Sequence, residues 1–358
     1  MRRIVKGIMV LVVVMVMECN SGGVKGEGTG GDGRGGGSLS EVLLEVGRSA
    51  ENAFYAFIEL MSDVLGFSVN TTTKKEDVGN HFRSLGKKLE DTSNELEEVA
   101  KKAEIGDGKS VSSKNPIREA VDSAKAVLNM LKGYIESLGT VGDLSVVGDA
   151  ETSAKQGVAA DDDALKKAYN SLKEIVKVAT GVGVKALKTG STTLSIDSVS
   201  NKDGAKILST STAGAAATDV SKAAIILTAV SGEEILDSIV KSGENDAALS
   251  NNADGTTSAM SFARGGQAAH LSNTDTPKAA SVAGGISLRS LVKTSKLAAG
   301  GNSKAQGGKE EVQKVGITAV NKLLGAVEEI VKKTVKSVLE KVKEEVDKAR
   351  DPKAAGKY

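Results

Sequence analysis

The single cysteine of the chain, Cys19, is the residue best placed to do chemistry. It follows a basic start with Arg2, Arg3 and Lys6, and then eleven apolar residues over 7–17. A bilayer span needs roughly 18 or more such residues, whereas this length fits the apolar region of a signal peptide. A thiol at this place is typical of a bacterial lipoprotein, where it takes up a diacylglyceryl group. Cleavage before it then frees an amine for a further acyl chain. We therefore expect Cys19 to be a lipidation site that anchors the chain.

Glu18 departs from the small residue that usually precedes a lipidated cysteine, whereas Val16 and Met17 fit the pattern. This departure predicts slow or inefficient cleavage. The alternative is a free cysteine in a leader that is not cleaved. In either case one cysteine excludes an internal disulfide and a cysteine-based zinc site.

Motifs of catalysis and metal binding are absent from the sequence, including G-x-S-x-G, the phosphate-binding P-loop and H-E-x-x-H. A His–carboxylate–Ser triad stays open on sequence alone, but nothing favours one. His81 is interpreted as a histidine at the edge of a helix seam, and His270 lies in a polar region. The carboxylates of 161–163 are interpreted as a helix cap rather than a cation site. We expect no enzyme activity, no cofactor and no catalytic or metal-binding residue.

The charge of the chain argues against nucleic acid as a partner. Its 47 basic and 46 acidic residues nearly cancel, and the chain without residues 1–18 has a net charge of −1. Proteins that neutralise many phosphates usually carry a basic excess.

Glycine dominates residues 20–37, which include formal G-x-G-x-x-G matches such as Gly31, Gly33 and Gly36. A dinucleotide site would need a strand before these glycines and a helix after them, but a signal peptide precedes them. The segment is therefore interpreted as a tether with a mean reach of about 25 Å.

Apolar residues recur at steps of three and four over most of the remaining chain, which is typical of amphipathic helices. Capping boxes at Ser38 and Ser231, and Asn115 before Pro116, mark helix starts. The pattern predicts helices over 39–66, 74–105, 116–138, 161–188, 214–241 and 309–350, with short helices within 277–298.

The segment 309–350 carries the longest apolar stripe and would form a helix about 60 Å long. Such a helix needs partner helices along most of its length, and 39–66 and 74–105 supply matching stripes. The segment between is rich in Gly, Ser, Thr and Asn. We predict an all-α fold, an elongated helical bundle with long N- and C-terminal helices packed together and a loop-rich, small-residue middle region.

Several stretches resemble one known family. They are CNSGGV at 19–24, AVSGEEIL at 229–236, AMSFARGG at 259–266, TPKAASVAGGISLRSLVKTSKLA at 276–298, and the Lys-, Glu- and Val-rich C-terminal segment. Together they are similar to the variable large proteins (Vlp) of relapsing-fever Borrelia, and to the related Lyme-disease surface antigen VlsE. The similarity covers the whole chain.

The resemblance implies a surface-exposed lipoprotein of the cell outer membrane, a variable antigen whose switching among silent plasmid copies evades host antibodies. Its implied partners are outer-membrane lipid, bound through the acylated Cys19, and host antibodies; the oligomeric state is not indicated. Only Cys19 matches a functional position of the family. The alternative function is an adhesin that binds a host receptor or matrix component.

The expected organisation has three parts: a lipoprotein signal peptide over 1–18, a Gly-rich tether over 19–38 and a single helical surface-antigen domain over 39–358. Within that domain we expect scaffold helices over 39–138 and 309–350. The irregular segment 139–308 should form the variable part that lies farthest from the membrane.

Overall fold

The computed structural model describes residues 39–59, 66–105, 115–211 and 214–350. By its internal contacts the chain divides into Met1–Ser38 and Leu39–Tyr358, and only the second unit contains described residues. The elements of this unit are, in chain order, α2 (Leu39–Glu59), α3 (Lys75–Ile105), α4 (Pro116–Leu138), α5 (Asp162–Gly181), β1 (Ser195–Ile196), β2 (Val199–Ser200), the 3-10 helix η2 (Lys202–Leu208), β3 (Ser209–Ser211), α6 (Asp219–Thr228), α7 (Gly232–Val240), α8 (Ala259–Arg264), β4 (Gly266–Gln267), α9 (Ala268–Leu271), α10 (Ala279–Leu291) and α11 (Lys309–Arg350).

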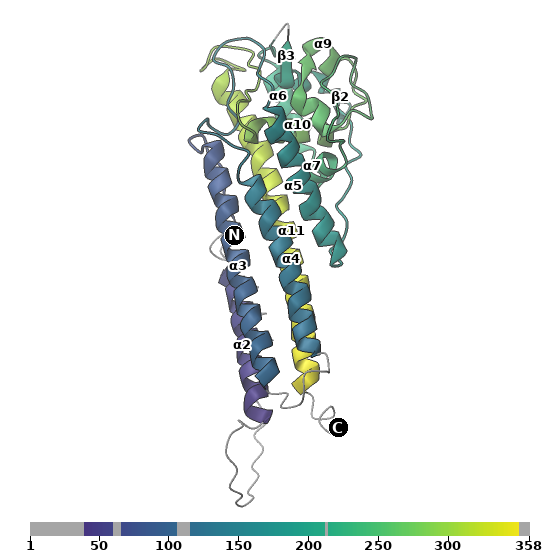
Figure 1. The fold of residues 1–358 in the computed structure, drawn as a ribbon. Helices are drawn as coiled ribbons and strands as arrows, with labels where there is room; N and C mark the ends of the chain where they lie inside the picture. The colour runs from purple at the N-terminus through teal and green to yellow at the C-terminus, as the bar shows by residue number, and fades with distance from the viewer. Residues whose placement is uncertain (1–38, 60–65, 106–114, 212–213, 351–358) are drawn as a thin grey trace, which may run out of the picture. The chain divides into compact units, whose positions relative to one another are not determined.

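The long helices α2, α3, α4 and α11 form a bundle. Helices α3 and α4 are antiparallel, because the amide of Asn115 at the start of α4 donates to the carbonyl of Ala103 near the end of α3, at 3.3 Å. Helix α11 contacts α2, α4, α5, α6, α7 and α10. Figure 1 shows the start of α2 and the end of α11 at one end of this bundle, and the short helices and strands at the other. The all-α expectation is confirmed.

The apolar stripes predicted for the second and the last long helix face the core. All the stripe positions of α3 are buried, namely Val78, Phe82, Leu85, Leu89, Thr92, Leu96, Val99 and Ala103. On α11 the stripe is buried from Val312 to Val346, while Ala349, near the end of the helix, is exposed. Burial of these side chains is the main contribution to the stability of the bundle.

Helix starts follow the capping residues of the sequence. The side chain of Asn115 accepts hydrogen bonds from the N–H groups of Ile117 and Arg118, at 2.9 and 3.3 Å. Asp161 accepts one from the N–H of Ala164 at 2.9 Å, so the acidic cluster begins a helix as predicted. The capping box at Ser38 and the predicted helix residues 60–65 lie outside the described residues.

Two predicted helix boundaries were wrong. The segment 214–241 forms two helices, because the capping box of Ser231 and Glu234 starts a new helix, α7, after α6 has ended. The helix expected over 161–188 ends at Gly181, and Gly183 after it has a φ of 95°, which glycine adopts without strain.

Polar side chains of α11 fix the segment that leads into α3. Asn321 bonds both backbone groups of Val69, with its Oδ1 2.8 Å from the N–H nitrogen and its Nδ2 3.0 Å from the carbonyl oxygen. One carboxylate oxygen of Glu328 accepts from the N–H of Gly66 at 3.0 Å. The other lies 3.0 Å from the buried ring nitrogen Nε2 of His81. Residues 66–69, which precede α3, are therefore held along α11 by side-chain hydrogen bonds.

The seam positions Leu89 and Leu323 provide a direct test of the packing. Each is almost fully buried, and truncation to alanine should lower the free energy of unfolding by about 2–5 kcal/mol. The matched control is Leu144→Ala, because Leu144 is 69% exposed. Its change should stay within about 0.5 kcal/mol. Equal losses for the three variants in urea denaturation would contradict the packing.

Candidate functional site

Cys19, the predicted lipidation site, lies outside the described residues, as do the whole leader and tether. Among the helices that the structure describes, none combines the length and the apolar content required to cross a membrane.

Exposed apolar side chains mark the segment between α4 and α11. Four of its large hydrophobic residues lie open to solvent: Leu144, Val158, Val199 and Ile225. Val199 belongs to an antiparallel hairpin in which β1 pairs with β2 across Asp197 and Ser198. These two residues have φ values of 50° and 64°, as in the type I′ turn that suits a two-residue hairpin. The hairpin presents a defined loop at the end of the bundle that carries the short elements (Figure 1).

Helix α10 holds this end of the bundle together, because all thirteen of its residues are buried. Its two central glycines lie against α8. A Cβ on Gly284 would come 2.8 Å from the Cβ of Ala259, and one on Gly285 would come 2.5 Å from that of Phe262. Larger residues would force the two helices apart, so the small residues at these positions permit close packing.

Arg289 on α10 is fully buried, and no carboxylate of the described residues forms an ion pair with it. Its Nε donates to the carbonyl of Ala263 at 2.7 Å, and its Nη1 to that of Val158 at 3.2 Å. Its Nη2 donates to the carbonyl of Leu208 at 3.4 Å. Burial lowers the pKa of Arg289 to about 9. The guanidinium thus joins α10 to three separate chain segments through their backbones.

Lys75, the first residue of α3, is a second buried cation with the same kind of partners. Its ammonium donates to the carbonyls of Val292 and Ser295, at 2.8 and 3.0 Å, and to the hydroxyl of Ser295 at 2.9 Å. Burial lowers its pKa to about 8, although the carboxylates of Asp143 and Asp149 partly oppose this. The start of α3 is therefore tied to the chain that follows α10.

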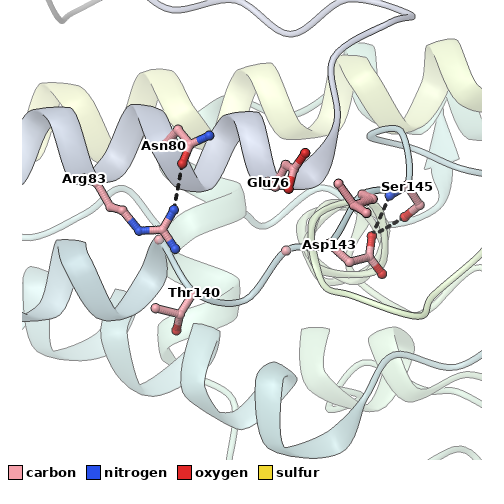
Figure 2. A pocket seen from close by; sticks show the side chains of 9 residues that line it. Glu76, Asn80, Arg83, Thr140, Asp143 and Ser145 are labelled. Atoms are coloured by element: carbon pink, nitrogen blue, oxygen red, sulfur yellow. Dashed lines mark hydrogen bonds between the residues drawn. The ribbon is translucent and has the colours of Figure 1, made fainter.

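A surface depression of about 530 Å³ lies between the start of α3 and the loop after α4. Figure 2 shows Arg83 turned toward Asn80, with its Nη1 2.7 Å from the amide oxygen, and Asp143 held by Ser145. Burial alone would raise the pKa of Asp143, but hydrogen bonds from Ser145 and from the N–H of Thr294 lower it overall. The hydroxyl of Ser145 also donates to Asp143, so Asp143 and Arg83 are both engaged by neighbours within the depression.

The two histidines singled out by the sequence have different surroundings. His81 is buried against Glu328 and stacks on Phe67 with ring centroids 4.5 Å apart, so it lies deeper than the predicted edge position. Glu328 is therefore engaged by Gly66 and His81 and not by Lys332, which lies four residues further along α11. Ring atom Nδ1 of His270 is buried and has no hydrogen-bond partner among the residues that the structure describes. Within the described ranges no cluster of three or more His, Cys, Asp and Glu residues could hold a metal ion.

Comparison with known proteins identifies the family. The family model described as "Borrelia lipoprotein" matches residues 50–346, which includes nearly all of the helical unit. The chain belongs to this family. It is 61% identical over 344 residues to Variable large protein 7 of Borrelia hermsii, covering 96% of this chain and 93% of the relative. It is 55% identical over 353 residues to Variable large protein 21 of the same species, covering 98% and 95%.

A solved structure shares the fold of this Borrelia lipoprotein. The crystal structure of the Lyme disease variable surface antigen VlsE of Borrelia burgdorferi aligns with a TM-score of 0.66 and 24% sequence identity. The alignment covers 86% of this chain and 98% of the other. The resemblance inferred from the sequence motifs is thereby confirmed.

The two buried cations, Lys75 and Arg289, were not predicted from the sequence. The stretches AMSFARGG and TPKAASVAGGISLRSLVKTSKLA, which carry the family resemblance, include α8, α10 and Arg289. The signal that could have revealed them is the isolated arginine in a helix of small and apolar residues. Lys75 gives no such signal, because its neighbours Lys74 and Glu76 resemble any solvated helix start.

Burial of Lys75 predicts an unusual dependence of stability on pH. Between its folded pKa of about 8 and its ordinary value of 10.5, the unfolded chain keeps a proton that the folded chain has lost. The free energy of unfolding should therefore rise with pH, by about 2 kcal/mol from about pH 7.5 to 9.5. Denaturation of the wild type and of Lys75→Met at several pH values isolates this contribution, since other groups titrate alike in both. Parallel curves for the two proteins would refute the assignment.

Proposed function

We propose that this Borrelia lipoprotein is a variable surface antigen, anchored in the cell outer membrane through lipid on Cys19, whose antigenic switching evades host antibodies. The observation that carries the proposal is the high identity to variable large proteins over nearly the full length of both chains. The leader and the sole cysteine support the anchor, with the signal peptide ending at residue 18 and the tether running over 19–38.

The architecture supports separate roles for the helices and the loops within 39–358. Scaffold helices of 39–138 and 309–350 bury continuous apolar stripes, so substitutions there disturb packing. Segment 139–308 contributes exposed loops such as the β1–β2 hairpin, which tolerate change because few contacts depend on them. We propose that these loops are the part that meets host antibodies and varies.

Orientation follows from the anchor in this proposal. Lipid on Cys19 is followed closely by α2, whose start lies at the same end of the bundle as the end of α11 (Figure 1). The opposite end, with α6, α9 and the strands, then faces outward. The names of the relatives support an antigen and give no support to the adhesin alternative.

Metabolic labelling with palmitate tests the anchor. The wild type should incorporate label, whereas Cys19→Ala should lose it because no other thiol is present in the chain. Ser21→Ala is the matched control and should keep the label. Label that persists in Cys19→Ala would exclude this acceptor. A separate variant, Glu18→Ala, should raise the fraction of processed protein.

Limited proteolysis of intact cells tests the orientation. Early cuts should map to exposed loops within 140–160 and 190–308, such as the turn at Asp197, because short surface segments open most readily. Helix α10 should resist within that range, since it is buried throughout. First cuts within α3 or α11 would overturn the proposed orientation.

A further inference from the structure

Helix α2 exposes two large apolar side chains away from its buried side. That buried side includes Val46, Ala53 and Phe57, and the helix contacts α3 and α11. Leu44 and Tyr55 instead lie open to solvent, with 48% and 56% of their surfaces exposed. Burial of such side chains against another surface would be favourable, because it removes apolar area from water.

The spacing of the exposed residues places them in one row along the helix. Leu44, Arg48, Glu51 and Tyr55 are all exposed, and they follow one another at steps of four, three and four. Residues at these steps lie on the same face of a helix. The same steps form the seam of a two-stranded coiled coil, in which the row of one helix packs against the row of another. These four residues are called the α2 face below.

The two charged residues in the middle of the α2 face have opposite signs. Neither Arg48 nor Glu51 forms an ion pair or a side-chain hydrogen bond with any residue that the structure describes. Charged residues between α3 and α4 behave differently, since Arg118 pairs with Glu97 at 2.9 Å. In a symmetric pair of identical surfaces, a contact between two different residues occurs twice. The α2 face is therefore complementary to a copy of itself, with two ion pairs available between its apolar ends.

We propose that the α2 face is a contact surface for a second copy of this chain, with the two α2 helices parallel. Leu44 and Tyr55 would each pack against the same residue of the other copy, while Arg48 of either copy pairs with Glu51 of the other. The parallel orientation rests on the proposed lipid anchor, because two copies held at the same end in one membrane stand the same way up. The tether over 20–38 has one large apolar residue, Val24, so it cannot cover both ends of the face.

The size of the α2 face sets the strength of this contact. Four residues from each copy are far fewer than the roughly 20–30 residues a side of a stable interface, so the contact is weak in dilute solution. Attachment to one membrane holds many copies close together, and a high effective concentration favours a weak contact. The pairing is therefore expected on the cell surface and not in a dilute solution of the purified chain.

Cysteine cross-linking on intact cells tests the proposal. Cys19 is the only cysteine of the chain and carries lipid in the anchored protein, so an introduced cysteine supplies the only free thiol. Tyr55→Cys and, separately, Leu44→Cys should each give a dimer with a short bifunctional maleimide, because parallel pairing brings identical residues together. Leu144→Cys is the matched control, since Leu144 is 69% exposed but lies outside α2. It should give about tenfold less dimer, because only chance collisions would join it.

Reversal of charge separates a specific contact from chance collision. In the Tyr55→Cys chain, Arg48→Glu should lower the cross-linked fraction about tenfold, because carboxylates would then face each other. Addition of Glu51→Arg returns opposite signs to the face and should restore the dimer, which a variant that had merely unfolded would not do. Unchanged cross-linking in Arg48→Glu, no recovery in the double variant, or as much dimer from Leu144→Cys would overturn the proposal.

Palmitate label measured on the same cells keeps this inference separate from the anchor. Labelled Tyr55→Cys protein that gives no dimer would overturn the pairing and leave the anchor intact. A dimer formed only between co-expressed Leu44→Cys and Tyr55→Cys chains would show antiparallel helices, and would overturn the parallel pairing. Protein without label would refute the anchor, and with it the orientation proposed for the pair.

Discussion

Continuous burial of one apolar stripe along α11 is the constraint on which the rest of the structure depends. This helix has 42 residues, and its stripe must be covered from Val312 to Val346. No single neighbour does so. Helices α2 and α4 contact it within the bundle, while α5, α6, α7 and α10 contact it among the shorter elements. The short elements are therefore organised around the same helix as the long ones, and one core links both ends.

Prediction from sequence succeeded where periodicity and capping carry the information. The stripe of α3 and the N-cap Asn115 define their elements locally, since a helix face and an orphan N–H depend on near neighbours. The sequence did not predict that α10 is buried on every side, because the Ala, Gly and Ser residues between its larger apolar residues can lie either in a core or at a surface. Its environment is set by α8 and α11, which contact it from distant parts of the chain.

Among the functional residues, too, those defined by local sequence could be predicted, and those defined by distant contacts could not. Cys19 could be predicted because lipidation is a property of a linear segment that an enzyme reads before folding. The partners of Lys75 and Arg289 could not be predicted, because they lie far away in sequence. Val292 is 217 residues from Lys75, and Ser295 is 220 residues from it. Long-range contacts of this kind leave no pattern in the local sequence.

The hydrogen bonds that hold the two buried cations have a consequence for how the sequence can diverge. Arg289 is bound by the carbonyls of Ala263, Val158 and Leu208, and every residue type offers the same carbonyl. A salt bridge would tie each cation to one particular acidic side chain, and replacement of either partner would leave a buried charge alone. Here the residues that supply the acceptors can exchange their side chains while the acceptors stay in place. Val158, whose side chain is exposed, is such a position. The hydrogen bonds that attach the loops to α10 thus do not depend on which side chains those loop residues carry.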